Sequence, residues 1–235
     1  MVSAPVIVTR AEPGASETLA RLTAKGIEAI ASPMLQLAAL SGAAPDMDGI
    51  SHLVFTSANG VRFFAEACDW RAGVAWCVGP STAAAARAAG FAHVHEGRGD
   101  AGDLAGDMIA ALPPESGGIL HVANEAAAGE LVARLSAAGL GARFAALYET
   151  RPMGHLAPEA AAALAAGPVF VLIHSAKGAA AFSDVCGPLQ HAVIVAISAA
   201  AAWPLQGLGA SAIVIAEAPN EAALMEALAT ARLGL

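Results

Sequence analysis

The chain has 235 residues, of which 57% are hydrophobic and only 14% are charged, and its formal net charge is −8. Such a composition can build a sizeable core and excludes an intrinsically disordered chain. No lysine- and arginine-rich run supplies the basic footprint that nucleic acid or an anionic membrane surface requires, so neither is expected as a partner.

Short β-rich runs alternate with alanine-rich helical stretches along the chain. We predict strands at residues 6–9, 27–31, 53–56, 75–78, 93–95, 119–122, 143–147, 169–174, 192–197 and 213–216. Helices fit between most of them, among these residues 16–25, 59–68, 81–89, 103–111, 129–138 and 221–232. Strict alternation predicts an α/β fold with parallel sheets covered by helices on both faces.

The segment from Val185 to Ala216 contains no Asp, Glu, Lys or Arg and is the nearest approach to a membrane span. Pro188, Pro204 and several glycines interrupt it. A strand, a helix and a second strand buried in an α/β core explain this segment better than a transmembrane helix.

The chain repeats itself internally. Residues 5–34 align without a gap on residues 118–147, residues 52–64 resemble 169–182, and residues 76–91 resemble 195–210. This repeat predicts two similar α/β domains, with a cleft between them as the place for a small-molecule site. Taken alone, it would suggest two sequential halves of about 110 residues.

Ligand sites in open α/β sheets lie beyond the carboxyl ends of the strands. The loops predicted there are Thr9-Arg10, Thr56-Ser57, Gly79-Pro80-Ser81-Thr82, Ala123-Asn124, His174-Ser175-Ala176-Lys177 and Ser198-Ala199. They offer small hydroxyl groups, glycine and free N–H groups at helix starts. Helix capping explains Ser57 and Asn59 as well as ligand binding does, although the repetition of the motif at Ser175–Gly178 supports a functional role.

Tyr148 is the only tyrosine of the chain and follows the second copy of the first repeated unit. One interpretation is a packing aromatic whose hydroxyl group is tied up by a partner. The other is a phenol that donates a proton or a hydrogen bond to a substrate. The residues alone leave both open.

Other motifs carry less weight. Gly97–Gly102 fits G-x-G-x-x-G between a strand and a helix, but Asp100 and Asp103 would repel a pyrophosphate, so a nucleotide-dependent enzyme is only a rival hypothesis. His93 and His95 lack a third ligand for a metal. Three cysteines without zinc or redox spacing indicate structural thiols in a reducing cytosol, and the N-terminus lacks the features of a signal peptide.

Taken together, the motifs form a specific series. The chain opens with V-x-x-T-R, continues with T-S-x-N-G-V (56–61) and V-G-P-S-T-A (78–83), and ends the series with Y-E-T-R-P (148–152) and S-A-x-G-A-x-x-F (175–182). In order and spacing this series resembles the uroporphyrinogen-III synthase family over essentially the whole chain.

The resemblance implies two doubly wound parallel-sheet domains joined by a two-segment linker. The chain would cross between them near residues 33–37 and 149–153. Domain one would then be discontinuous, comprising residues 1–35 and 154–235, and domain two would comprise residues 38–148.

The resemblance also implies an activity. The enzyme would be a lyase, a cyclising hydro-lyase of porphyrin and heme biosynthesis. It would convert linear hydroxymethylbilane to uroporphyrinogen III through a spiro intermediate, with inversion of ring D and loss of water. No cofactor and no metal are expected, and we expect a cytoplasmic monomer with transient contacts to neighbouring enzymes of tetrapyrrole biosynthesis.

Residue roles follow from the same resemblance. Tyr148 matches the tyrosine thought to assist departure of the hydroxyl group. The expected substrate-binding residues are Thr9, Arg10, Thr56, Ser57, Asn59, Gly79, Ser81, Thr82, Ser175, Ala176, Lys177 and Ser198. Backbone N–H groups at these helix starts, with Arg10 and Lys177, would hold the carboxylates of a polyanionic substrate despite the acidic protein.

Two departures from the family pattern stand out. Ser198-Ala199-Ala200-Ala201-Ala202 replaces a turn that is richer in hydroxyl groups, and Ala123-Asn124 replaces an Arg-Gly pair. These departures support one alternative function, a catalytically impaired module of the same fold that binds a tetrapyrrole without converting it.

Overall fold

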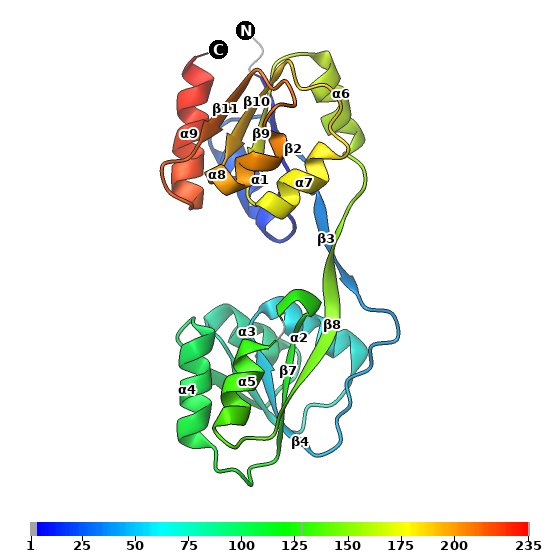
Figure 1. The fold of residues 1–235 in the computed structure, drawn as a ribbon, viewed down its shortest axis with the longest axis vertical. Helices are drawn as coiled ribbons and strands as arrows, with labels where there is room; N and C mark the ends of the chain where they lie inside the picture. Colours follow the sequence, from blue (N-terminus) through cyan, green and yellow to red (C-terminus); the bar gives the residue numbers. More distant parts are fainter. Residues whose placement is uncertain (1–3, 128, 235) are drawn as a thin grey trace. The chain divides into compact units, whose positions relative to one another are not determined.

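The computed structural model describes residues 4–127 and 129–234. The chain divides into two compact units. Unit 1 comprises Met1–Leu37 and Arg151–Leu235, and unit 2 comprises Ala38–Thr150 (Figure 1).

Unit 1 is built on a parallel sheet in the order β11-β10-β9-β1-β2. Its strands are β1 (Val6–Val8), β2 (Ala29–Ala31), β9 (Val169–Ile173), β10 (Ala192–Ala196) and β11 (Ala212–Ile215). Helices α1 (Gly14–Ala24) and α9 (Glu221–Leu233) pack on one face. The other face carries α6 (Pro158–Ala166), α7 (Ala176–Ser183), α8 (Ala199–Ala202) and the 3-10 turn η2 (Trp203–Leu205).

The sequence of β9 explains why both faces of this sheet are covered. Successive side chains of a strand point to opposite faces. Phe170 and Leu172 therefore join the core under α1 and α9, while Val169, Val171 and Ile173 join the core on the opposite face. An uninterrupted apolar strand is thus buried on both sides, as a central parallel strand requires.

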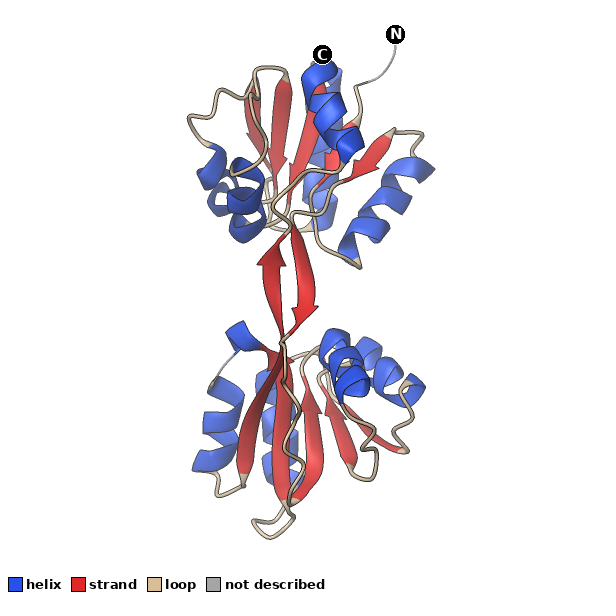
Figure 2. Ribbon diagram, turned by 90° about the vertical axis from the view of Figure 1, so that its right-hand side faces the viewer, coloured by secondary structure: helices blue, strands red, loops and turns tan. Residues whose placement is uncertain are grey.

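Unit 2 is built on a sheet in the order β3-β8-β7-β4-β5-β6. Its strands are β4 (Ile50–Phe55), β5 (Val74–Cys77), β6 (His93–Glu96) and β7 (Gly118–Asn124), together with β3 (Leu35–Ala39) and β8 (Ala142–Pro152), which each run across the boundary between the two units. Its helical elements are α2 (Ala58–Ala67), α3 (Pro80–Ala88), α4 (Ala101–Ala111), the 3-10 turn η1 (Glu125–Ala127) and α5 (Glu130–Ala137). Figure 2 shows helices on both faces of each sheet.

Apolar side chains of the helices in unit 2 pack on its sheet. Leu104 of α4 and Leu135 of α5 pack with Val54 on one face of the sheet. On α2, Phe64 meets Phe55 edge to face, with ring centroids 5.8 Å apart. All strand pairs from β8 to β6 are parallel.

The internal repeat holds at the level of strand register. Val8 and His121 are aligned in the repeat, as are Leu172 and Val54, and the structure pairs Val8 with Leu172 and His121 with Val54. The outer pairs correspond as well, because Ala196 pairs with Ile173 and Cys77 pairs with Phe55. The prediction of two similar, mostly parallel α/β sheets is confirmed.

The structure corrects three details. The sequence did not predict β3, and it ended the strand that begins at Arg143 at Leu147, whereas β8 continues to Pro152. It also placed Ala123-Asn124 in a loop, whereas both residues belong to β7. β3 lies at the edge of its sheet beside β8, and the hydrogen bonds Leu40 N to Leu147 O and Met153 N to Met34 O give the two segments antiparallel order. Neither segment has the apolar pattern of a central strand, so only their mutual pairing identifies them.

The charge-free segment from Val185 to Ala216 contains β10, α8, η2 and β11, as predicted. None of the helices in the described part of the chain combines the length and the apolar character needed to cross a bilayer.

Candidate functional site

Three serines begin helices in the same way. Ser57, Ser175 and Ser198 each have extended backbone and each accept a hydrogen bond in the first turn, from the N–H groups of Gly60 (3.2 Å), Gly178 (3.0 Å) and Ala201 (3.2 Å). The capping interpretation is therefore confirmed for Ser57 and for its repeat counterpart Ser175, whereas Asn59 lies inside α2 and is not its N-cap. Ser198 caps its helix in the same way, which the sequence did not predict. Capping uses an oxygen lone pair and leaves each hydroxyl hydrogen able to donate to a further partner.

Tyr148 lies against the first of these serines in unit 2. Its hydroxyl oxygen is 3.1 Å from Oγ of Ser57, and its ring stacks on Phe63 with centroids 4.5 Å apart and planes 10° apart. Only 5% of Tyr148 is exposed. The packing interpretation is thus confirmed, and the phenol is held by its ring and by its hydroxyl group at the start of α2.

A buried histidine supports the same loop. The Nε2 atom of His121 lies 3.3 Å from Oγ1 of Thr56, and its ring meets Phe144 edge to face. His121 is 3% exposed, its Nδ1 has no hydrogen-bond partner among the described residues, and burial lowers its pKa to about 4. Neutral His121 thus fixes the hydroxyl group of Thr56, a contact that the sequence did not reveal.

The remaining predicted residues of unit 2 lie around two helix starts. Gly79 is the extended N-cap of α3 and is buried, Thr82 is buried in the first turn, and Ser81 between them is exposed. A Cβ atom on Gly79 would lie 3.4 Å from Cα of Gly99, so this turn packs closely against the 97–99 loop. Asn59 is half-buried in the first turn of α2.

The glycine-rich motif ends at a helix cap. Asp100 accepts hydrogen bonds from the N–H groups of Gly102 (2.7 Å) and Asp103 (3.0 Å) at the start of α4. A carboxylate of the chain itself therefore occupies the position that a pyrophosphate would need at this helix.

Thr9, Arg10 and Ser175 line one pocket in unit 1. Leu35, His174 and Gly178 complete most of its wall, and its volume is about 230 Å³. Thr9 is buried and donates to the carbonyl oxygen of Leu172 at 2.7 Å. Ala176 and Lys177 are exposed in the first turn of α7, and Ser198 begins α8. The pocket contains N–H and O–H donors of the kind that hold carboxylates.

Glu221, the first residue of α9, joins four side chains next to this pocket. Its carboxylate lies 3.3 Å from Nη1 of Arg10, 2.8 Å from Oγ1 of Thr18, 3.5 Å from Nη1 of Arg21 and 3.2 Å from Nε2 of His174. Burial lowers the pKa of His174, an effect that Glu221 opposes and Arg10 reinforces. Because 211 residues separate Glu221 from Arg10, no local sequence pattern indicates this ion pair.

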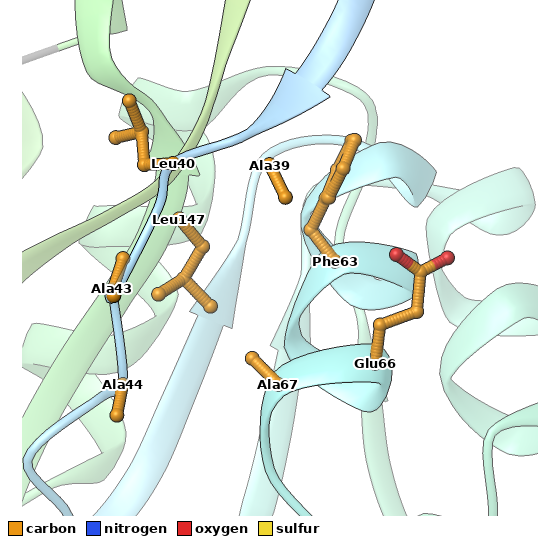
Figure 3. A pocket seen from close by; sticks show the side chains of 9 residues that line it. Ala39, Leu40, Ala43, Ala44, Phe63, Glu66, Ala67 and Leu147 are labelled. Atoms are coloured by element: carbon orange, nitrogen blue, oxygen red, sulfur yellow. The ribbon is translucent and has the colours of Figure 1, made fainter.

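An apolar pocket of about 300 Å³ lies elsewhere in unit 2. Figure 3 shows Phe63 and Leu147 among its walls, with Glu66 at its side. Phe63 also stacks on Tyr148, so one ring belongs to both features. The larger of the two pockets described here is therefore not the one that contains the predicted polar residues.

The second departure from the family pattern has a structural consequence. Asn124 donates to Oγ1 of Thr150 at 3.0 Å and accepts from the N–H group of Ala126, so its amide is used within unit 2.

Burial raises the pKa of Cys77 to about 12, which keeps that thiol protonated. In the described part of the chain, no group of three or more His, Cys, Asp and Glu side chains could hold a metal ion.

The structure thus brings some of the predicted residues together, in three groups. Thr9, Arg10 and Ser175 share one pocket of unit 1. In unit 2, Ser57 and Tyr148 are in direct contact, while Gly79, Ser81 and Thr82 belong to the separate start of α3. Phe63, His121 and Glu221 are the functional candidates that sequence reasoning did not identify, whereas His174 lies in a predicted loop without an assigned role.

Two solved structures similar to this chain are uroporphyrinogen-III synthases. The uroporphyrinogen-III synthetase of Helicobacter pylori 26695 has a TM-score of 0.58 at 17% identity, over 97% of this chain and 99% of that chain. A mutant uroporphyrinogen III synthase of Thermus thermophilus has a TM-score of 0.46 at 16% identity, over 99% of both chains. A search of curated proteins finds no match.

At this identity the Helicobacter structure shows a shared fold. The family model described as uroporphyrinogen-III synthase HemD matches residues 16–226 of this sequence, which is most of its length. The chain belongs to the uroporphyrinogen-III synthase HemD family.

Proposed function

We propose that this protein converts hydroxymethylbilane to uroporphyrinogen III, as a cyclising hydro-lyase that needs no cofactor. The observation that carries the proposal is the contact of 3.1 Å between the hydroxyl groups of Tyr148 and Ser57 in a chain of this family. Uroporphyrinogen-III synthase is the name of the matching family and of the similar solved structures.

Tyr148 is proposed as the general acid. Its phenol donates a proton to the departing hydroxyl group, which leaves as water. The carbon that carried this hydroxyl group then bonds to the ring D carbon that already holds the bridge to ring C, which gives the spiro intermediate. The original bond between ring D and that bridge breaks, the freed bridge carbon bonds to the opposite α-carbon of ring D, and the proton that leaves this carbon restores the phenol of Tyr148. The sum is loss of one water molecule, which balances the reaction.

Ser57 and Phe63 support this role physically. The stacked ring of Phe63 limits rotation of the Tyr148 ring, and the hydroxyl group of Ser57 provides a partner when the phenol has given its proton away. In this proposal the rate acceleration comes mainly from holding the flexible bilane in one orientation, and proton donation by Tyr148 contributes less.

Substrate binding is proposed for the predicted polar residues at the helix starts. Thr9, Arg10, Ser175, Ala176, Lys177 and Ser198 would serve in unit 1, and Thr56, Ser57, Asn59, Gly79, Ser81 and Thr82 would serve in unit 2. Acetate and propionate carboxylates match free helical N–H groups and Arg10 chemically. A substrate cleft, the monomeric state and the cytoplasmic location stay predictions.

The proposed domain division follows the family expectation. We propose domains of residues 1–35 with 154–235 and of residues 38–148, joined by linkers at about 33–37 and 149–153. Limited proteolysis would test this division, since cleavage should concentrate in the two linkers if they are the accessible joints.

Analysis of the product isomers tests the function directly. Fresh hydroxymethylbilane is incubated with and without protein, the products are oxidised, and type I and type III porphyrins are separated by chromatography. Without an enzyme the bilane closes to type I. Dominant type III from the wild-type protein, reduced in Tyr148→Phe, is the expected result.

One observation favours a second candidate function. α8 has alanine at all four of its positions, and the oxygen of Ser198 already caps Ala201, so this helix start offers little polar side-chain chemistry. A module that binds a tetrapyrrole without converting it would have such a site. Type I product alone, from folded protein that binds a porphyrin, would favour this candidate.

A further inference from the structure

Glu221 is the centre of the largest polar cluster described in unit 1. Its carboxylate meets donors from three other parts of the fold: Arg10 after β1, Thr18 and Arg21 on α1, and His174 after β9. The side chain of Glu221 is 19% exposed, whereas that of Arg10 is 37% exposed. The cluster therefore runs from a largely buried carboxylate to a guanidinium group at the edge of the unit 1 pocket.

Helix capping does not require this carboxylate. Asn220 is the N-cap of α9 and accepts from the N–H group of Ala223 at 2.9 Å. Glu221 is free to extend toward α1 and β9 instead, although its charge at the first turn also suits the helix dipole.

The internal repeat provides a natural comparison. In unit 2 the equivalent helix α4 begins at the cap Asp100, so Ala101 is the counterpart of Glu221. Arg134, aligned with Arg21, lies next to this helix start, where a Cβ atom on Gly102 would be 3.2 Å from its Nη1. Unit 2 thus builds the same sheet and helices with no acidic residue at this position, so the fold itself does not demand Glu221.

The charges of the cluster leave a positive excess. Arg10 and Arg21 bring two positive charges against one negative charge of Glu221. Arg10 contacts Glu221 through Nη1 alone, and a guanidinium group has five N–H donors. Among the described residues Glu221 is the one carboxylate paired with Arg10, and Arg10 lines a pocket together with Thr9 and Ser175.

We propose that Glu221 is a positioning residue, which holds the guanidinium group of Arg10 at the unit 1 pocket so that Arg10 binds a carboxylate side chain of the substrate. A planar guanidinium group fixed on one side by a carboxylate presents its remaining donors in a defined direction. This inference rests on the proposed function for the identity of the substrate. It assigns no chemical step to Glu221.

The expected effect is on binding. In Glu221→Gln the side chain keeps its size and one acceptor oxygen but loses the charge that anchors Arg10. KM for hydroxymethylbilane should rise about 10-fold with kcat changed less than about 2-fold, because an interaction present equally in ground and transition states is lost. Glu221→Asp, which keeps the charge on a shorter side chain, should recover part of this loss.

Arg21→Met is the matched control. It removes another ion pair of the same carboxylate, from a side chain that is half exposed and does not line the pocket. If the cluster had only a structural role, Arg21→Met and Glu221→Gln would both lower the thermal stability and both keep the wild-type KM. That result would overturn the proposal. Should Glu221→Gln fail to fold, Glu221→Asp and Arg10→Gln supply the same comparison.

Titration with uroporphyrin, followed by porphyrin fluorescence, gives a readout that needs no turnover. This octacarboxylate should bind Glu221→Gln about 10-fold more weakly than the wild-type protein, and Arg21→Met as tightly as the wild type. If the wild-type protein forms only type I product but this difference in porphyrin affinity is seen, the inference stands and the proposed function fails. If type III is formed and both variants keep the wild-type KM and affinity, the inference fails and the function stands. A wild-type protein that neither forms type III nor binds uroporphyrin would overturn both.

Discussion

His121 makes the folded protein sensitive to acid. It is 3% exposed, no residue in the described part of the chain pairs with its Nδ1, and burial lowers its pKa from 6.5 to about 4. Between these two values the unfolded chain binds a proton at this residue and the folded chain does not, so the free energy of unfolding falls as the pH falls from about 6.5 to about 4. At 1.36 kcal/mol per pH unit, the full contribution of His121 is about 3 kcal/mol, which is a large part of the stability of a typical domain.

The assay is urea unfolding at a series of pH values between 4 and 8, on the wild-type protein and on His121→Gln and His121→Leu. Both variants remove the titrating ring, while only glutamine can keep a hydrogen bond to Thr56. Burial also lowers the pKa of His52 and His174, so the variants should retain a weaker acid sensitivity of the same sign. Each variant should lose about 3 kcal/mol less than the wild-type protein on going from pH 7 to pH 4.

The two variants separate titration from packing. Leucine at position 121 changes the stability at pH 7 through altered packing and the lost contact with Thr56, by about 1–3 kcal/mol. That cost is independent of pH. Parallel stability curves for the wild-type protein and both variants would refute the reasoning, because His121 would then titrate equally in the folded and unfolded chains.

The remaining predictions concern Tyr148, the two helix-capping serines Ser57 and Ser175, and Gly60 of α2. Tyr148→Phe keeps the stack on Phe63 and loses only the hydroxyl contact with Ser57. The free energy of unfolding should therefore fall by about 1 kcal/mol, and kcat should fall about 10-fold to 10⁴-fold. An unchanged kcat in the isomer assay would refute the proton-donor role. Ser57→Ala and Ser175→Ala each lose an N-cap and should cost about 1 kcal/mol in thermal or urea unfolding, and stability unchanged within error in either variant would contradict the capping geometry. Gly60→Ala places a Cβ atom 2.9 Å from the carbonyl oxygen of Val122, which is closer than real Cβ atoms approach an oxygen. The variant should therefore be less stable by about 1–3 kcal/mol in urea unfolding. A more stable variant would show that α2 and β7 move apart without cost.

The repeat is the clearest case in which sequence patterns predicted three-dimensional structure. Ser57 and Ser175 were aligned by sequence, and each accepts a hydrogen bond from the N–H group three residues later at the start of a helix. The same alignment places Val8 and His121 at equivalent register positions of the two sheets. Aligned apolar positions bury the same faces, and the pairing register follows because a shift by one residue would turn the apolar side chains outward.

The candidate site was predicted less completely. The sequence named Thr9, Arg10 and Ser175 from the rule on strand ends, and one pocket contains all three. It named Tyr148 and Ser57 but did not indicate that they are in contact, and it did not name Phe63, whose ring stacks on the phenol. A residue type at a strand end can be read from a pattern, whereas the side chain that orients it comes from whichever element packs beside it.

Local patterns in the chain were enough to establish the alternation of strands and helices, the two similar sheets, the capping serine before α2 with its counterpart before α7, and most of the loops at the strand ends. These features depend on periodicity and on short-range hydrogen bonds, which are set by the order of neighbouring residues. Three contacts became visible only in the folded protein: β3 pairs with β8, His121 holds Thr56, and Glu221 reaches Arg10. These contacts join residues far apart in the chain, and the order of strands in each sheet brings them together.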